Sequence, residues 1–427
     1  MTHSPMPVAG AATDHRELLP FSHLLKLSIY WLGIQALWGG INSIILPARI
    51  DAIDPANAGV LLALIQAAAV AMAIVVQPTV GMISDFTISR WGRRKPYIVI
   101  GATLDVVFLI GFATAQGYVS IIAFLVLLQF SSNFAQGPFQ GYVPDLVPAR
   151  QVATASGLMG VMIVMGQIVG TGVAQAGGLH NLLLPTIGLG LIELATAVVL
   201  ISSVREGTGA PPRRGSWLQV GLSAWGADIL RERNVLWLLL VRLLFLGAIN
   251  VIAYGLFLFQ RSHGLDPDAA GGWVFWTTVI VGIATAAAAL PGARLSDRFG
   301  RRNMIWGACA VGAVGLLGVA IAPSPELVIV AFIPFGIASG TFLSVDWALM
   351  TDVIPKQTTG RYMGILNAGT AGAGPVYWII AGFVMDTVGR TDPAAGPRAA
   401  MVVAAIFMAA AALALVRVDP TRRELEA

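Results

Sequence analysis

One stretch decides the fold of this sequence: Gly81-Met82-Ile83-Ser84-Asp85-Phe86-Thr87-Ile88-Ser89-Arg90-Trp91-Gly92-Arg93-Arg94-Lys95, which connects two long apolar runs. A shorter copy follows in the second half, Ser296-Asp297-Arg298-Phe299-Gly300-Arg301-Arg302. The aspartates of the two copies are 297 − 85 = 212 residues apart in a chain of 427 residues. An acidic and then basic loop that repeats at half-chain spacing between apolar runs indicates a duplicated membrane protein of the transporter type.

Apolar residues dominate the composition. The chain is 56% hydrophobic and 11% charged, with a mean hydropathy of +0.78. A water-soluble protein of this size could not bury so much apolar surface in one or two cores. Division at charged and Pro/Gly-rich breaks leaves about twelve apolar runs of roughly 20 residues, each long enough to cross a bilayer as a helix. They lie near 24–47, 58–83, 97–115, 119–143, 153–176, 183–204, 235–259, 270–292, 304–322, 327–350, 362–384 and 399–416.

A second internal repeat supports the duplication. Asp145 follows the fourth run and Asp352 follows the tenth, 352 − 145 = 207 residues later, and a proline stands three residues after each of them. We therefore expect an all-α integral membrane fold with twelve transmembrane helices in two pseudo-symmetric six-helix halves around a central cavity. Residues 1–204 and 235–427 would form the halves. Residues 205–234 would form a cytoplasmic linker with a short amphipathic helix on the membrane surface.

The basic residues predict the orientation. Most of the 26 lysines and arginines fall in loops on the side that holds both termini, and such residues favour the cytoplasmic side. We expect an integral protein of the plasma (cytoplasmic) membrane with both termini in the cytoplasm. The net charge of +4 is spread over loops that face lipid head groups. Membrane lipid is therefore an expected partner and nucleic acid is not, and we expect the monomer to be the functional unit.

Polar side chains within the apolar runs predict the position of the cavity, because a polar group in hydrocarbon must face protein or water. In the fourth run, Gln129, Asn133 and Gln136 share one helix face. Amides and aromatic rings suit a small, neutral, polyhydroxylated substrate such as a sugar. The expected substrate-binding residues are Gln35, Trp38, Asn42, Gln66, Gln129, Asn133, Gln136, Asn250, Tyr254, Asn367 and Trp378. The alternative is that these side chains only join neighbouring helices.

Few ionisable residues lie within the runs: Asp105, Glu193, Arg242 and Asp346. A charge at mid-bilayer costs about 2.5–3.5 kcal/mol on insertion scales, so each calls for a partner or a function. We predict that Asp346 carries a coupled proton (H+); the alternative is a carboxylate paired with Arg361 or another basic residue on the inner side. For Asp105 and Glu193 we expect either mutual pairing or contact with a water-filled crevice.

The basic loops are the expected inner gate. An aspartate at the end of one helix and arginines beyond the turn can lock the two halves together through ion pairs and contact with a helix end. The expected gating residues are Gly81, Asp85, Arg90, Gly92, Arg93, Arg94, Asp297, Gly300, Arg301 and Arg302. The alternative, simple anchoring by positive residues, accounts for the arginines but not for the repeated glycine and aspartate.

These features resemble the major facilitator superfamily over all twelve runs, and the loop 81–95 matches its gating signature. The segment 75–98 also resembles sucrose/H+ symporters of the glycoside–pentoside–hexuronide:cation symporter group, as do 33–47 and 133–138. This resemblance implies a secondary transporter that moves a sugar or glycoside by alternating access with proton coupling. The chain departs from that group at Gln129, where those symporters carry an acidic residue, and at Ala153, where they carry an arginine.

Two other functions stay open at this point. One is a proton-driven exporter of hydrophobic compounds, although 160–172 lacks the proline typical of the fifth span of such exporters. The other is a non-transporting membrane sensor or assembly factor. The sequence shows no nucleophile–base pair and no metal-ligand spacing, so we expect no enzyme activity, no cofactor and no metal site.

Overall fold

The structure, a computed structural model, describes residues 17–87, 89–178, 181–204, 206, 233–353 and 372–418. Every regular element in these ranges is a helix. Eleven of the described helical segments are long and apolar enough to cross a membrane, and Ala373–Gly389 is a shorter apolar helix. The all-helical membrane architecture expected from the apolar runs is therefore confirmed. The expected linker helix, Arg361 and Asn367 lie outside the described residues.

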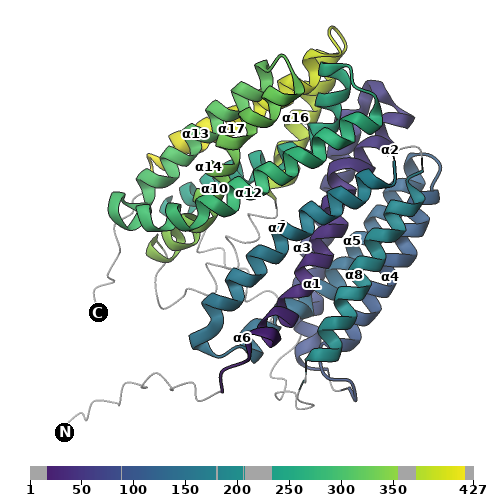
Figure 1. Cartoon of the computed structure of the whole chain (residues 1–427), viewed down its shortest axis with the longest axis vertical. Coiled ribbons are helices and arrows are strands. Elements are labelled where there is room, and N and C mark those ends of the chain that lie inside the picture. The colour runs from purple at the N-terminus through teal and green to yellow at the C-terminus, as the bar shows by residue number, and fades with distance from the viewer. Residues whose placement is uncertain are drawn as a thin grey trace.

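The first bundle contains the six long helices before residue 204 and the short turns between them. These elements are α1 (Phe21–Gly40), η1 (Ile41–Ile45), α2 (Leu46–Ile53), η2 (Pro55–Asn57), α3 (Ala58–Asp85), α4 (Lys95–Thr114), α5 (Tyr118–Gln140), α6 (Tyr142–Leu146), η3 (Ala149–Gln151), α7 (Val152–Ala176) and α8 (Leu183–Ser203). In Figure 1 they run from purple to teal and lie together on one side of the molecule.

The second bundle lies beside the first and runs from green to yellow in Figure 1. Its elements are α10 (Arg233–Ile249), η5 (Asn250–Tyr254), α11 (Gly255–Phe257), η6 (Leu258–Ser262), α12 (Pro267–Phe299), α13 (Arg301–Ile321), α14 (Pro325–Val353), α16 (Ala373–Gly389) and α17 (Ala395–Leu415). Between the bundles, α3 packs on α16 and α7 packs on α12. These two helix pairs set the relative position of the bundles.

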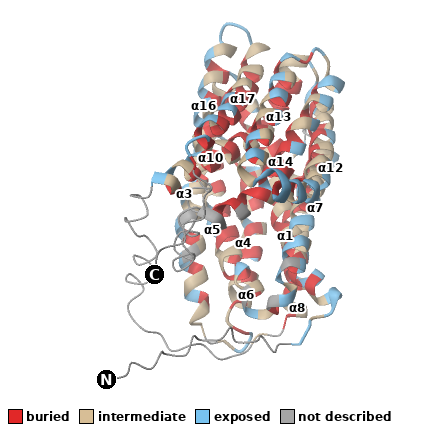
Figure 2. Cartoon of the chain, turned by 90° about the vertical axis from the view of Figure 1, so that its left-hand side faces the viewer, coloured by how far each residue is buried: buried red, intermediate tan, exposed pale blue. Residues whose placement is uncertain are grey.

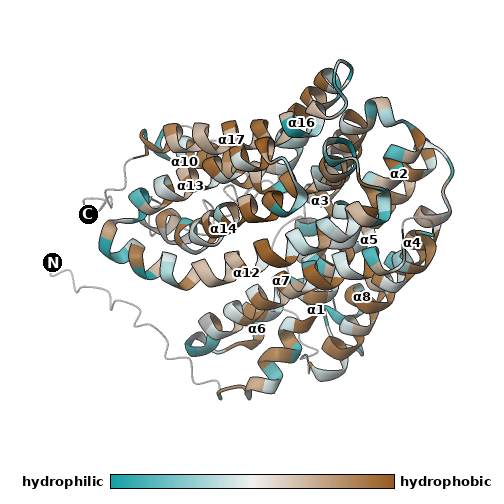
Figure 3. Ribbon diagram, turned by 45° about the horizontal axis from the view of Figure 1, so that its top comes forward, coloured by the Kyte–Doolittle hydropathy of each residue, from teal (hydrophilic) through white to brown (hydrophobic). Residues whose placement is uncertain are grey.

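Burial follows the helix faces that a bilayer requires. Buried residues concentrate between the helices (Figure 2), and apolar residues continue along their outer faces (Figure 3). Large side chains such as Val119, Ile321 and Leu413 are exposed on these outer faces. Hydrophilic residues gather at the turns and helix ends in Figure 3. This distribution suits contact with lipid chains along the helices and with water at their ends.

Two helices change their hydrogen-bonding pattern partway along. The first helix passes through a π-helical turn, η1, and the seventh passes through a 3₁₀ turn, η5; the two turns contact each other. Asn42 lies in η1 and Asn250 lies in η5, 250 − 42 = 208 residues apart. Such local irregularities often mark functional sites, because they redirect side chains and leave backbone groups outside the regular ladder.

The bundles are held together at the end remote from the start of α1. The carboxylate of Asp386 on α16 accepts hydrogen bonds from the backbone N–H of Gly59 (2.9 Å) and of Val60 (2.7 Å) in the first turn of α3. Arg261 pairs with Asp51 (2.5 Å) and donates to the carbonyl of Pro55 (2.7 Å). A carboxylate at a helix N-terminus satisfies unpaired backbone donors and meets the positive end of the helix dipole.

Close contact between α1 and α7 depends on Gly170. A Cβ atom at this position would lie 1.9 Å from the backbone oxygen of Ala36. We therefore expect Gly170→Ala to lower the free energy of unfolding by about 1–3 kcal/mol, the usual range for overpacking. The measurement is thermal unfolding of the purified protein in detergent. Gly160→Ala on the same helix is the matched control, because a Cβ there meets nothing within 4 Å. Equal melting temperatures for the two variants would contradict this close packing.

Candidate functional site

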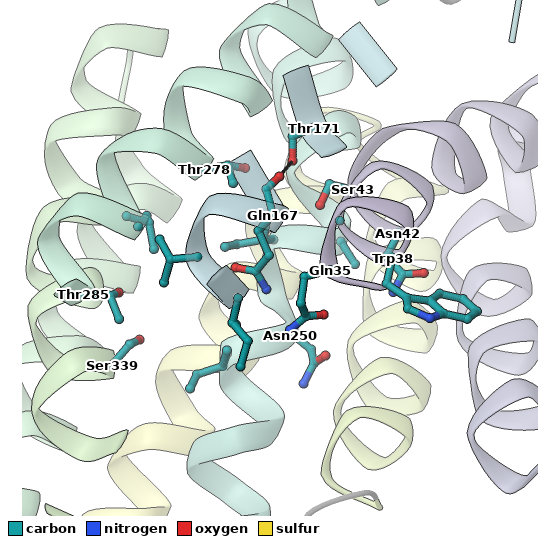
Figure 4. A pocket seen from close by; sticks show the side chains of 18 of the residues that line it. Gln35, Trp38, Asn42, Ser43, Gln167, Thr171, Asn250, Thr278, Thr285 and Ser339 are labelled. Atoms are coloured by element: carbon teal, nitrogen blue, oxygen red, sulfur yellow. Dashed lines mark hydrogen bonds between the residues drawn. The ribbon is translucent and has the colours of Figure 1, made fainter. Parts of the chain in front are cut away.

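A cavity of about 370 Å³ lies between the two bundles (Figure 4). This volume falls within the range of about 300–1,000 Å³ common for small-molecule sites. Helices of both bundles line it, and its polar residues are Gln35, Trp38, Asn42, Ser43, Gln167, Thr171, Asn250, Thr278, Thr285, Ser339 and Trp378. None of the described residues that line the cavity carries a charge. Such a lining can hydrogen-bond a neutral solute from several sides.

Amides and hydroxyls face each other across this cavity. In Figure 4, Gln35, Gln167 and Asn250 lie near one another, with Thr285 and Ser339 on another side. The hydroxyls of Thr171, Thr278 and Ser339 donate to carbonyls of their own helices, at 2.7, 2.9 and 2.9 Å. A hydroxyl that donates in this way still has lone pairs for an incoming donor. The cavity therefore offers both donors and acceptors.

The two tryptophans of the cavity differ in their hydrogen bonds. The indole N–H of Trp38 donates to the hydroxyl of Ser132 on α5 (3.0 Å). Trp378 is 6% exposed, and its buried indole N–H has no hydrogen-bond partner among the described residues. A buried donor without a partner is uncommon and costly in a folded protein, so its position in a cavity wall calls for a ligand or a water molecule.

The structure brings together only part of the predicted substrate site. Gln35, Trp38, Asn42, Asn250 and Trp378 line the cavity. Two further predicted residues support its wall. The amide of Gln66 donates to the side-chain oxygen of Asn42 (3.1 Å), and the hydroxyl of Tyr254 donates to the backbone carbonyl of Trp378 (2.9 Å).

The predicted stripe on the fourth span does not line this cavity in the described structure. The side-chain amide of Asn133 donates to the backbone oxygen of Gln129 (2.8 Å) and to its side-chain oxygen (2.9 Å). Both residues are buried within their bundle, and Gln136 is absent from the cavity wall as well. For Gln129 and Asn133 this geometry matches the alternative of polar pairing within the protein.

Several residues that line the cavity were not predicted from the sequence. They are Ser43, Gln167, Thr171, Thr278 and Thr285. A signal was present, because Gln167 and Thr171 are four residues apart on α7 and the two threonines of α12 are seven apart. Both spacings place side chains on one helix face. Single hydroxyl residues in a span commonly bond to their own backbone, which made this signal weak.

Asp346 of α14 forms a buried ion pair with Arg242 of α10. The rings of Phe245 and Phe342 stack on the same two helices, with centroids 3.7 Å apart and an interplanar angle of 5°. Along α14, the cavity residue Ser339 is followed about one turn later by the stacked ring of Phe342, and about one turn after that by Asp346. The acid therefore has a basic partner, and stacked rings lie between it and the cavity.

The loop after α3 holds a compact charge cluster. Arg94 is 6% exposed, and its guanidinium contacts Asp85 (2.6 Å), Asp145 (2.9 Å) and the carbonyl of Pro138 (2.8 Å). Arg93 also pairs with Asp145, at 2.9 Å. Gly92 has a φ of +110°, a backbone conformation that favours glycine. The loop thus bonds back onto its own bundle, next to the contact of Gly81 with Gly137.

Glu206, which follows the last helix of this bundle in the sequence, completes the cluster. Its carboxylate accepts from the backbone N–H of Arg94 (2.9 Å) and of Lys95 (3.2 Å), and from the hydroxyl of Tyr142. Burial, and after it the Glu206 carboxylate, raise the pKa of the Tyr142 phenol well above its usual value. The phenol therefore stays protonated and remains a donor to the carboxylate.

The second copy of the loop is more open. Asp297 lies exposed in the last turn of α12, Gly300 has a φ of +86°, and Arg301 begins α13. Arg302 donates to the carbonyl of Val416 (2.8 Å). In the first copy, Arg90 is also exposed and stacks over Trp91 at 5.9 Å. The repeated motifs therefore have different surroundings in the two bundles.

Comparison with known proteins assigns this architecture to a family. The sequence model of the Major Facilitator Superfamily matches residues 27–285 and 274–427. The chain belongs to this superfamily. The expected family and the two-bundle fold are thereby confirmed. Among solved structures, the nucleoside transporter NupG has a TM-score of 0.72 at 14% identity, covering 93% of this chain and 99% of that one. A D-xylose-proton symporter has a TM-score of 0.61 at 18% identity, covering 90% and 95%. At these identities the likeness shows the fold.

Sequence relatives match over shorter segments. Sucrose transport protein SUT1 of Oryza sativa subsp. japonica is 33% identical over 131 residues, which cover 25% of this chain and 24% of that protein. Sucrose transport protein SUT4 of Oryza sativa subsp. indica is 27% identical over 203 residues, covering 42% and 32%. The human membrane-associated transporter protein is 33% identical over 94 residues, covering 18% and 17%. These matches span about a sixth to a third of the relatives' length.

Labelling of introduced cysteines tests which polar residues face water. Cys309 is the one cysteine of the chain and is buried, so a Cys309→Ser background is needed. We expect Gln35→Cys and Gln167→Cys to react with a small, water-soluble thiol reagent at least ten-fold faster than Gln129→Cys and Asn133→Cys, because only the first two positions line the cavity. The rate of mass increase reports the reaction. Equal rates at all four positions would contradict this assignment, and faster reaction at Gln129→Cys and Asn133→Cys would place the water path along α5.

Proposed function

We propose that the protein is a secondary transporter that moves a small, neutral, polyhydroxylated solute, a sugar or glycoside, across the cytoplasmic membrane by alternating access. The observation that carries this proposal is the uncharged cavity between the bundles, with its amides, its hydroxyls and the indole N–H of Trp378, which has no partner among the described residues. Amides donate and accept, as sugar hydroxyls do, and an indole face covers the C–H side of a sugar ring. The sucrose transport proteins among the relatives support the same substrate class.

The lining favours this substrate over the hydrophobic compounds of an exporter. A purely apolar solute would offer no hydrogen bonds to the side chains of Gln35, Gln167 and Asn250 in the cavity wall. We place both termini in the cytoplasm, from the basic residues of the adjoining loops. The contacts of Asp386 and Arg261 then lie at the outer end, and this structure is the state closed to the outside.

We further propose that residues 1–204 and 235–427 move as two units in a monomer surrounded by lipid, joined by the linker 205–234. The cluster of Asp85, Arg93 and Arg94 bonds within its own bundle in this state. In the opposite state the loops 81–95 and 296–302 would close the inner end against the facing bundle. The gate would then form only when the outer contacts open.

Proton coupling is proposed at the pair of Asp346 and Arg242. A buried carboxylate that loses its basic partner becomes costly unless it binds a proton. Movement of α14 against α10 would separate the two groups, so that proton binding and the position of the helices depend on each other. The stacked rings of Phe245 and Phe342 lie between this pair and the cavity, and they would transmit the movement.

Ligand-induced stabilisation tests the substrate class. A solute that binds only the folded protein raises its stability by RT ln(1 + [L]/Kd), about 2.7 kcal/mol at a hundred times Kd. We expect a sugar or glycoside to raise the melting temperature of the purified protein in a thermal-shift screen. The rise should disappear in Gln167→Ala and Asn250→Ala but persist in Gln140→Ala, a control at the exposed end of α5. Stabilisation by amphiphilic apolar compounds, with none by sugars, would favour an exporter instead.

Accumulation against a gradient tests the coupling. We expect Asp346→Asn to abolish solute accumulation in proteoliposomes under an imposed pH difference, because the amide cannot carry a proton. Solute counterflow, which needs no net proton movement, should continue. Asp392→Asn, in an exposed turn, is the control and should accumulate solute as the wild type does. Continued accumulation by Asp346→Asn would exclude Asp346 as the proton carrier. If solute accumulation by the wild type did not depend on the pH difference, the protein would be a facilitator or a carrier coupled to another ion.

A further inference from the structure

Asp105 and Glu193 form a second buried acidic site, separate from the cavity. Asp105 lies on α4 and Glu193 on α8, and both side chains are 0% exposed. α4 packs on α8 at this level, where a Cβ atom on Gly190 would lie 3.4 Å from Cα of Val106, and the two carboxyl groups lie side by side between these helices. The hydroxyl of Ser131 on α5 donates to Oδ1 of Asp105, and the hydroxyl of Tyr30 on α1 lies 3.3 Å from Oε1 of Glu193. Four helices thus meet at two acids.

One oxygen of each acid has no donor. Among the described residues, no N–H or O–H group reaches Oδ2 of Asp105 or Oε2 of Glu193. The groups that face the pair from the surrounding helices are the phenol of Tyr30 on α1 and the hydroxyl of Ser131 on α5; α4 and α8 present no other ionisable group to it. No described basic side chain contacts it. Two ionised carboxylates at this distance, without a cation, would be strongly disfavoured in a bilayer.

Tight helix packing keeps the pair from water. A Cβ atom on Gly33 of α1 would lie 2.0 Å from Oγ1 of Thr196 and 2.8 Å from Cα of Glu193. A Cβ atom on Gly101 of α4 would lie 2.6 Å from the backbone oxygen of Ser131. These two glycines bring α1 onto α8 and α4 onto α5 at nearly the levels of the two acids, which leaves no room there for solvent that could stabilise two charges.

We propose that Asp105 and Glu193 form a proton-binding site that holds one proton between Oδ2 and Oε2. One carboxyl group then donates to the other, both oxygens gain a partner, and the remaining single negative charge is stabilised by the hydroxyls of Ser131 and Tyr30. The site lies in the first bundle, whereas Asp346 lies in the second. It does not rest on the proposed substrate or on the proposed role of Asp346.

The site is connected to the cavity wall through hydrogen bonds of two neighbouring residues on α5. Ser131 bonds to Asp105, and the next residue, Ser132, accepts from the indole of Trp38 in the cavity wall. Loss of the shared proton would leave two adjacent negative charges and push α4 and α8 apart. The position of α5, and with it the anchor of Trp38, therefore depends on whether the proton is bound.

Infrared spectroscopy of the full chain in lipid tests the site without any substrate, with pH as the only variable. We expect the wild type at neutral pH to show the carbonyl band of a buried, protonated carboxyl group that disappears in alkaline buffer. The band should be lost in the double variant Asp105→Asn/Glu193→Gln. It should be kept in Asp346→Asn, because the wild-type Asp346 is an ionised partner of Arg242 and does not contribute to the band. An unchanged band in a folded double variant would overturn the proposal, as would the absence of the band in the wild type.

Tyr30→Phe provides a second test that keeps both acids. It removes a donor that stabilises the ionised pair, so the proton should stay bound to more alkaline pH. We expect the titration midpoint of the band to move to a proton concentration at least several-fold lower than in the wild type. An unchanged midpoint would contradict the site even where the double variant fails to fold. Sugar binding or transport by a wild type that lacks the band would overturn this site and leave the proposed function standing.

Discussion

Hydrocarbon offers no water to the polar groups that helices carry into it, and this constraint accounts for most of what the polar residues do here. Asn133 bonds to Gln129 on its own helix, Arg242 pairs with Asp346, and Asp105 faces Glu193. Each arrangement keeps polar groups together inside one bundle and away from lipid. The remaining amides and hydroxyls gather in a cavity between the bundles, where a solute can take the place of a protein partner.

The same constraint explains which features of the structure could be predicted from the sequence alone. Apolar runs of membrane-spanning length predicted the helices, because every backbone donor in lipid must be bonded within its own segment. The repeated aspartates at 85 and 297 predicted the two bundles, since a duplicated sequence folds into duplicated structure. Neither inference requires knowledge of how any helix is rotated about its axis.

The cavity required that knowledge. A polar stripe such as Gln129 and Asn133 satisfies the demands of lipid equally well by facing a neighbour or by facing water, and the periodicity is the same in both cases. Packing decides between them, through contacts between residues more than a hundred positions apart, such as Arg242 with Asp346. Asn42 of η1 and Asn250 of η5, both expected from their polar character within apolar runs, do line the cavity.

Helix α3 links features that belong to opposite surfaces of the membrane. Its first turn is held by Asp386 of the other bundle, and its last residue, Asp85, binds Arg94. The helix has 28 residues, a length of about 42 Å at 1.5 Å per residue. In the proposed alternating-access mechanism this helix would act as a lever that pivots against α16, so that its inner end moves toward the facing bundle when its outer end is released. The stiffness of this one helix would then be enough to open one surface while the other closes, without any coupling through the solute.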